Sequence, residues 1–213
     1  MLFTLTIFGA TKKMEFIDQI IRRVQRRAEE RDIALSLYAA SVGQARKQEF
    51  YINCGISDTL DGRFDLIVLH VHIVTRNLIS TGDKGVRLSN LVFKTMMDDM
   101  DMNLREMGVG DLSVGKRVKA MARAFYGRAR AYDKAFKIEE KVGCDLEDDN
   151  KLTSSENLEF VLNRNIYGKK EPELEQLKML AEYVRDTQNM LATSIGNSLK
   201  SGNVTFPSAP GER

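Results

Sequence analysis

The sequence contains no tryptophan and only three prolines, all of which lie after residue 171. Proline interrupts helices because it lacks a backbone N–H and clashes with the preceding turn, so most of the chain is free to form long helices. The helix-forming residues Ala, Leu, Lys, Arg, Glu and Met are plentiful, and hydrophobic residues make up 43% of the chain. We therefore predict an all-α fold, a compact domain of about six to eight helices.

Cysteine and histidine are also scarce, and their scarcity argues against several kinds of site. Cys54 and Cys144 lie far apart and form no CxxC pair, which favours a reduced intracellular protein over a disulfide-stabilised one. His70 and His72 would point to different sides of a helix, so they cannot hold one metal together. The sequence has no G-x-S-x-G either. We predict a protein that is not an enzyme and has no metal or cofactor.

Long apolar runs and a strong charge of one sign are missing as well. The longest apolar run, from Leu66 to Val74, is interrupted by two histidines and is far below the roughly 20 residues that a membrane helix needs. The N-terminal run MLFTLTIF has no positive residues before it and no clear signal-peptide cleavage site after it. We expect a cytoplasmic protein whose first eight residues make peripheral contact with the inner membrane.

Apolar residues recur at helical spacing along most of the chain. The spacing predicts helices over residues 14–31, 33–48, 58–78, 89–107, 113–137, 155–166 and 172–199. Asp58, Ser89 and Ser113 are the expected N-caps of three of these helices, and Thr153 with Glu156 forms a capping box for another. The run IVLHVHIV would also suit a buried strand, but no second strand of similar strength is present to pair with it.

Charge and composition divide the chain into four parts. We predict a helical core over residues 14–140, which carries the main motifs, and further helices over 153–200 that pack on this core. Between them, residues 141–152 are rich in acids and read as a solvated linker. Residues 201–213 contain Gly, Ser and Pro and are predicted to form a flexible tail.

The stretch GDLSVGKR, residues 110–117, has the spacing of a phosphate-binding loop. Such a loop follows a strand and carries Ser or Thr after its lysine, whereas here a helix precedes it and Arg117 follows Lys116. We instead interpret Gly108, Gly110 and Gly115 as a structural corner between two helices. The nearby Asp99 does not start a calcium loop, since the required Gly and Glu are missing.

Methionine is concentrated in one region, since six of the ten methionines lie between residues 96 and 121. Methionine is flexible and polarizable, so it suits surfaces that bind varied apolar partners. Most of the six are expected to be core, and Met100 and Met107 lie on the predicted core stripe. Met97 and Met102 lie off that stripe and are the candidate client-binding residues.

Residues 116–137 hold eight Lys or Arg against one acid. A helical face of one charge binds RNA, anionic lipid or an acidic partner, or it pairs with the protein's own acidic segment. The candidate basic docking surface consists of Lys116, Arg117, Lys119, Arg123, Arg128 and Arg130.

Two stretches resemble one known family. DTLDGRFDLIVLH (58–70) and LREMGVGDLSVGKRVKAMARAFYGR (104–128) are similar to the ubiquinol–cytochrome c chaperones of bacteria and mitochondria. YAASVGQARKQEFY (38–51) fits the same pattern, and NRNIYG (163–168) fits it more loosely. The likeness covers roughly residues 33–190.

The resemblance implies a non-enzymatic assembly chaperone of the respiratory ubiquinol–cytochrome c reductase, which holds newly made cytochrome b. Mitochondrial members of the family are associated with the ribosome and with a small partner protein, so the resemblance offers one or the other as a further partner, although no motif of this sequence carries that contact. We expect no binding to DNA. The alternative is a helical RNA- or ribosome-binding module that acts through the basic helix 116–137.

Overall fold

The computed structural model describes residues 3–142, 157–168, 170–193 and 197–212, and helices are the only regular elements in these ranges. This confirms the predicted all-α class. The elements are α1 (Phe3–Ala45), α2 (Glu49–Ile52), α3 (Leu60–Ile79), α4 (Asp83–Glu106), α5 (Asp111–Val142), α6 (Leu158–Leu162), the π-helix η1 (Asn163–Tyr167), α7 (Leu174–Thr193) and α8 (Asn197–Lys200).

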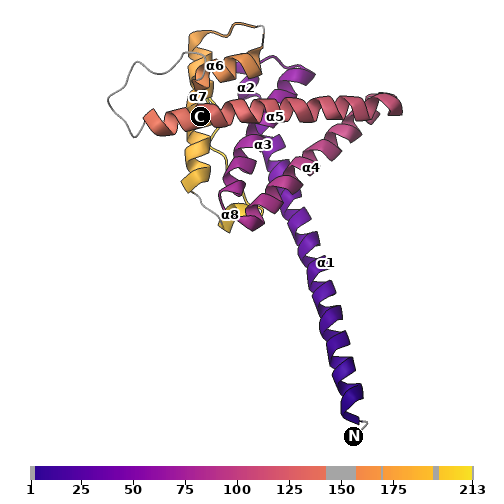
Figure 1. The fold of residues 1–213 in the computed structure, drawn as a ribbon. Helices are drawn as coiled ribbons and strands as arrows, with labels where there is room; N and C mark the ends of the chain where they lie inside the picture. The colour runs from indigo at the N-terminus through magenta and orange to yellow at the C-terminus, as the bar shows by residue number, and fades with distance from the viewer. Residues whose placement is uncertain (1–2, 143–156, 169, 194–196, 213) are drawn as a thin grey trace.

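Helix α3 is the centre of the domain (Figure 1). Every residue from Asp65 to Thr75 is buried, and α1, α4, α5 and α7 pack against it. A helix that is apolar all round is stable only where neighbours cover every side. The ambiguous run IVLHVHIV is therefore a buried helix and not a strand.

Helix α1 differs from the prediction, which placed two helices over residues 14–31 and 33–48. The structure has one helix of 43 residues, Phe3–Ala45. The sequence around Asp32 contains no glycine or proline to stop the helix, and Ser36 Oγ donates to Asp32 O at 3.0 Å within it. The part of α1 before Glu30 extends away from the other helices (Figure 1).

Three helices also begin at positions other than those predicted. Thr59, not Asp58, is the N-cap of α3, because its side chain accepts from Gly62 N at 3.1 Å, while Asp58 pairs with Arg63 at 2.6 Å. Helix α4 starts at Asp83 after Gly82, six residues before the predicted cap Ser89, which is buried inside the helix. Helix α5 starts at Asp111, so Ser113 is already in its first turn.

The C-terminal helices pack on the core through α3 and α5. Helix α6 starts at Leu158, and Asn157 is its N-cap, with Oδ1 accepting from Phe160 N at 2.8 Å. Thr153 and Glu156 of the predicted capping box lie outside the described residues, as does the acidic linker except for its first two residues, which end α5. The helix predicted over 172–199 begins at Leu174, and its described part ends at Thr193.

The C-terminal segment is packed, in contrast to the flexible tail predicted for residues 201–213. Ala209 is buried, Asn53 Nδ2 donates to Pro210 O at 2.7 Å, and Gln44 Nε2 donates to Pro207 O at 3.0 Å. Phe206 adds its ring to the core next to His70. Composition missed this packing because small residues and proline suit a buried extended segment as well as a mobile one.

Candidate functional site

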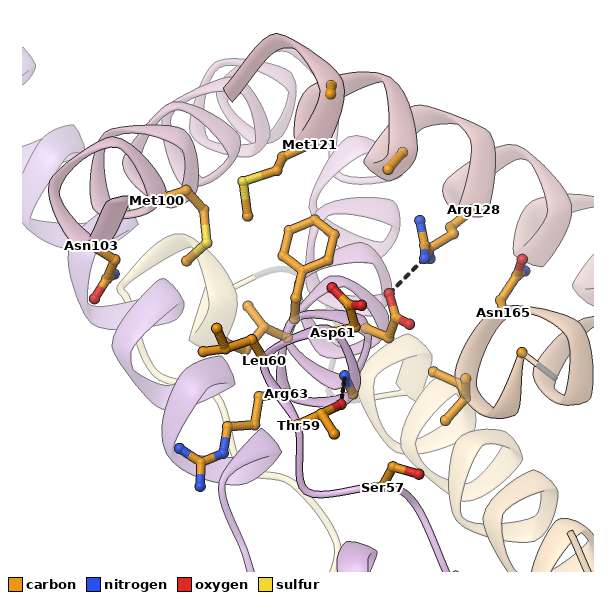
Figure 2. Close-up of a pocket in the computed structure, with 18 of the residues that line it drawn as sticks. Ser57, Thr59, Leu60, Asp61, Arg63, Met100, Asn103, Met121, Arg128 and Asn165 are labelled. Carbon is orange, nitrogen blue, oxygen red and sulfur yellow. Dashed lines mark hydrogen bonds and ion pairs between the residues drawn. The ribbon is translucent and has the colours of Figure 1, made fainter. Parts of the chain in front are cut away.

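A groove of about 1210 Å³ lies between the first turns of α3, the end of α4, the first half of α5 and η1. Figure 2 shows these elements around it, with side chains of α3 at its centre. Arg46 at the end of α1 also lines it. Three segments that are far apart in sequence, 57–67, 100–128 and 164–168, thus meet at one hollow in the surface.

The lining combines an apolar area with charged groups. Its large apolar side chains are Leu60, Phe64, Ile67, Met100, Leu104, Met107, Val109, Met121 and Ile166. Leu60 and Met107 are 69% and 53% exposed, whereas Met100 and Leu104 are buried and form the floor. Five arginines and two aspartates stand around this area, namely Arg46, Arg63, Arg117, Arg128, Arg164, Asp61 and Asp65.

The start of α3 places four of these side chains. The Thr59 cap fixes the first turn, so the pairs Leu60/Phe64 and Asp61/Asp65, each spaced by four residues, lie along one side of the helix. Gly62 permits the tight entry into the helix, because a Cβ on it would lie only 2.1 Å from Ser57 O.

Asp65 and Arg128 form an ion pair in the wall of the groove, with Nη2 2.7 Å from Oδ1 (Figure 2). Asp65 Oδ1 accepts no well-aligned hydrogen bond, so the pair is held by the electrostatic attraction between the carboxylate and the guanidinium. Arg128 also places its guanidinium carbon 5.9 Å from the centre of the Phe64 ring.

Burial raises the pKa of Asp65 to about 7, although the Arg128 guanidinium opposes the rise, and Asp61 adds a smaller rise. A carboxylate with this pKa changes its charge near neutral pH. Arg128 therefore lets Asp65 ionise at a lower pH than burial alone would allow.

The π-helix η1 closes the far side of the groove. Tyr167 Oη donates to Cys54 O at 2.8 Å, which ties η1 to the loop before α3. Lys170 Nζ donates to Gly55 O at 2.7 Å in the same loop. The left-handed Gly168, with φ of 62°, ends η1, so the NRNIYG stretch forms one wall and its turn.

The glycine corner between α4 and α5 is a Schellman C-cap. Gly108 has φ of 79°, its N–H donates to Arg105 O at 2.9 Å, and Val109 N donates to Leu104 O at 3.0 Å. Gly110 O accepts from Ser113 N at the start of α5. Gly115 lies in the helix, with nothing within 4 Å of a Cβ placed on it. Gly108 alone of the three has a backbone that favours glycine.

The two client-binding candidates lie outside the groove lining. Met102 is 56% exposed, whereas Met97 is half-buried and packs against the core. Met107, expected in the core, is exposed at the groove edge, because α4 ends there and the corner turns away. The methionines that line the groove are Met100, Met107 and Met121.

The predicted basic surface is divided between two faces of α5. Arg117 and Arg128 line the groove, and Arg128 is paired with Asp65. The remaining candidates are exposed and follow one another on the other side of the helix, and Lys137 continues their row. We call this row the basic stripe, and it comprises Lys116, Lys119, Arg123, Arg130 and Lys137.

The two histidines of α3 contact different helices. His70 lies in the core with Nε2 2.9 Å from Tyr183 Oη, and His72 Nε2 lies 3.4 Å from Asp133. Among the described residues, no three His, Cys, Asp or Glu side chains come together as metal ligands. No helix in the described ranges is both long and apolar enough to span a bilayer.

The fold and the groove define a class of helical protein with a methionine-containing apolar hollow and a charged rim, which suits reversible binding of an apolar segment. Residues 53–206 match the model of the ubiquinol-cytochrome C chaperone family, and the chain belongs to this family. The match starts after the predicted 38–51 segment and extends into the packed C-terminal segment.

Individual relatives agree with this assignment. The chain is 26% identical over 166 residues to ubiquinol-cytochrome c reductase complex assembly factor 1 of Mus musculus, covering 78% of this chain and 51% of the relative. The Xenopus laevis counterpart is 25% identical over 166 residues, which is 78% of this chain and 76% of that protein. The chain thus spans about half the length of the mouse relative.

A solved structure supports the fold over nearly the whole chain. The crystal structure of the Cbp3 homolog from Brucella abortus superposes with a TM-score of 0.73 and 28% identity. The superposition covers 92% of this chain and 98% of the other. The long α1 helix, which precedes the family match, is therefore largely inside the structural likeness.

Sequence reasoning missed the groove itself, including Leu60, Phe64 and Met121. The signal was present in the three stretches 58–70, 104–128 and 163–168, which carry the family resemblance and all contribute to the lining. Spacing within one helix cannot show that separate stretches meet, so only the fold connects them.

Proposed function

We propose that this protein is an assembly chaperone for ubiquinol–cytochrome c reductase and that it holds an apolar segment of newly made cytochrome b in the groove. The observation that carries the proposal is the convergence of the family-like stretches on one partly apolar hollow. The names of the curated relatives support a role in the assembly of ubiquinol–cytochrome c reductase. The choice of cytochrome b as the client follows from the family resemblance.

The groove is suited to holding a client and releasing it. Met100, Met107 and Met121 can change rotamer to fit different apolar side chains. Burial contributes about 25 cal/mol per Å² of apolar surface, so a contact of a few hundred Å² gives transient affinity. The arginines and aspartates at the rim can bind the polar groups at the ends of such a segment.

A photo-crosslinking side chain compares the groove with the surface predicted from sequence. It is placed at Met107 in the groove and, in a matched variant, at Met102 outside it, since the two positions are 53% and 56% exposed. The proposal expects crosslinks to newly made cytochrome b from position 107 and few from position 102. Crosslinks from position 102 alone would indicate that the client binds the face predicted from Met97 and Met102 and not the groove.

The cellular consequence is measured with a substitution in the groove. Met121→Lys places a charge in its wall, and it should lower capture of cytochrome b and the level of assembled reductase. Met102→Lys is the control for a new charge outside the groove. Normal assembly in a folded Met121→Lys strain would contradict the proposal.

The basic stripe favours a second candidate function, binding to RNA or to the ribosome. None of its five cations forms an ion pair with an acid of the described residues, and a single-sign helical face attracts phosphate groups. Lys119→Glu, Arg123→Glu and Arg130→Glu together should abolish ribosome co-sedimentation. Arg128 is left unchanged because it belongs to the ion pair with Asp65.

A further inference from the structure

The outer part of α1 carries an apolar face that nothing in the described structure covers. Residues 16–29 are all exposed, and Glu30 is the first buried residue after them. Phe16 and Val24 are 62% and 59% exposed. We call this face the α1 apolar stripe, and it comprises Phe16, Ile17, Ile20, Ile21 and Val24.

The stripe is too wide for a simple coiled-coil seam. At about 100° per residue its side chains span about 140° of the helix circumference, whereas a two-stranded coil needs a narrow seam of alternating positions. A heptad that uses Ile17, Ile20 and Val24 would next place Arg27 and Arg31 in the seam. A second copy of the chain is therefore a poor occupant.

The charges beside the stripe identify a better occupant. Four exposed arginines lie on or beside the polar side of the helix. At about 100° per residue, Arg23 and Arg27 lie at the edge of the stripe, whereas Arg22 and Arg26 lie further round on the opposite face. An apolar face bordered by arginines lies in the interface of an anionic bilayer, with the apolar groups among the acyl chains and the cations at the headgroups.

The position of the segment permits this contact. Glu30 Oε1 accepts from Arg87 Nη2 at 3.0 Å where α1 meets the domain, and the helix before this point extends freely (Figure 1). The stripe can therefore lie along a surface without any rearrangement of the domain.

We propose that residues 16–27 of α1 bind the surface of an anionic lipid bilayer, with the α1 apolar stripe inserted and the arginines at the phosphate groups. The proposal goes beyond the proposed function, since it concerns a separate segment and requires no client. It also differs from the membrane contact predicted from sequence, which was assigned to the first eight residues.

The absence of tryptophan from the chain allows a direct test with the full-length protein. Phe16→Trp introduces a single tryptophan in the stripe, and Leu174→Trp is the control because Leu174 is similarly exposed, at 67%, on α7. Vesicles containing phosphatidylglycerol should shift the emission of Phe16→Trp to the blue. Leu174→Trp should not shift, and pure phosphatidylcholine vesicles should have little effect on either variant.

Charge and apolar contact are then separated by vesicle co-sedimentation. Each of Arg23→Gln and Arg27→Gln, which border the stripe, should weaken binding about fivefold, since one cation near an anionic surface contributes about 1 kcal/mol. Ile20→Asp with Ile21→Asp should reduce binding at least as strongly. The matched control changes Lys119, Arg123 and Arg130 of the basic stripe to Gln and should bind normally.

Three results would overturn the proposal. The first is an emission of Phe16→Trp that vesicles leave unchanged. The second is binding that is lost only in the basic-stripe control, which would assign the lipid contact to α5. The third is a blue shift that appears without vesicles as the protein concentration rises, which would identify a second copy as the occupant. The assay contains no cytochrome b, so its outcome is independent of the client proposal.

Discussion

The imidazole of His70 and the hydroxyl of Tyr183 join α3 to α7 in the core, 2.9 Å apart. His70 Nδ1 lies 2.7 Å from Leu66 O, which can only accept, so Nδ1 carries the proton of the neutral ring. Tyr183 therefore donates to His70 Nε2, and it accepts from Gln44 at 3.0 Å. This arrangement requires the histidine to be neutral.

Acid should destabilise the protein through His70. Burial lowers the pKa of His70 to about 4, so between pH 6.5 and 4 the unfolded chain binds a proton that the folded one does not. The free energy of unfolding should fall as the pH drops through this window. Denaturant unfolding of the His70→Gln variant should show a smaller fall, and an unchanged slope would assign the acid sensitivity to other groups.

Removing Arg128 should have an effect that depends on pH. Arg128→Met leaves Asp65 buried and without its cation, and breaking a buried pair in this way costs about 3 kcal/mol. The loss should appear at pH 8, where Asp65 is charged, and should shrink at pH 5, where its raised pKa keeps it protonated. Arg123→Met, an exposed control on the same helix, should stay within about 0.5 kcal/mol at both values.

Alanine at the corner glycines should have opposite effects. Gly108→Ala forces a side chain into a left-handed residue with φ of 79° and should cost about 1–2 kcal/mol. Gly115→Ala fills open space inside α5 and should stabilise the protein by about 0.5–1 kcal/mol. Thermal unfolding measures both. Equal losses in the two variants would mean that Gly115 has a constraint beyond helix propensity.

The two methionines outside the groove should tolerate charge differently. Met102→Lys adds an exposed ammonium and should change stability by less than about 0.5 kcal/mol. Met97 packs against the core, so Met97→Lys should cost about 1–2 kcal/mol. Chemical denaturation of the two single variants compares them. If Met97→Lys proves neutral, its contact with the core contributes little.

The C-terminal segment should contribute measurably to stability. Phe206→Ala removes a half-buried ring beside His70 and should cost about 2 kcal/mol, less than the loss of about 3–5 kcal/mol for a fully buried ring. Lys47→Ala breaks only the ion pair with Glu212, whose side chains are 34% and 36% exposed, and should have little effect. A melting temperature unchanged in Phe206→Ala would indicate that the segment packs without stabilising the domain.

The helices were predictable from sequence because each depends on local periodicity, and the stripe Val92, Met96, Met100 and Leu104 is buried as expected. Their ends were less predictable, since Asp58 and Thr59 are both suitable N-caps by residue type and only the geometry selects Thr59. The cap of α3 shows that a local rule with two adjacent candidates cannot choose between them.

The site could be predicted only in part. The family-like stretches were visible, but the groove depends on how Leu60, Met107 and Ile166 meet across three elements. The basic helix was also visible, yet its charges could not be divided between two faces until Arg128 was found beside Asp65. Long-range pairing of this kind leaves no periodic signal in one sequence.

The uninterrupted course of α1 fixes a rotational relationship between its outer end and the domain. The helix runs from Phe3 to Ala45 without a break, so the direction of the stripe at Ile20 determines the direction of the buried face at Leu37. On the proposed bilayer contact, this rigidity decides which side of the domain faces the lipid. One residue inserted near Ala28 would turn the outer end by about 100° about the helix axis and present a different side of the domain to the bilayer.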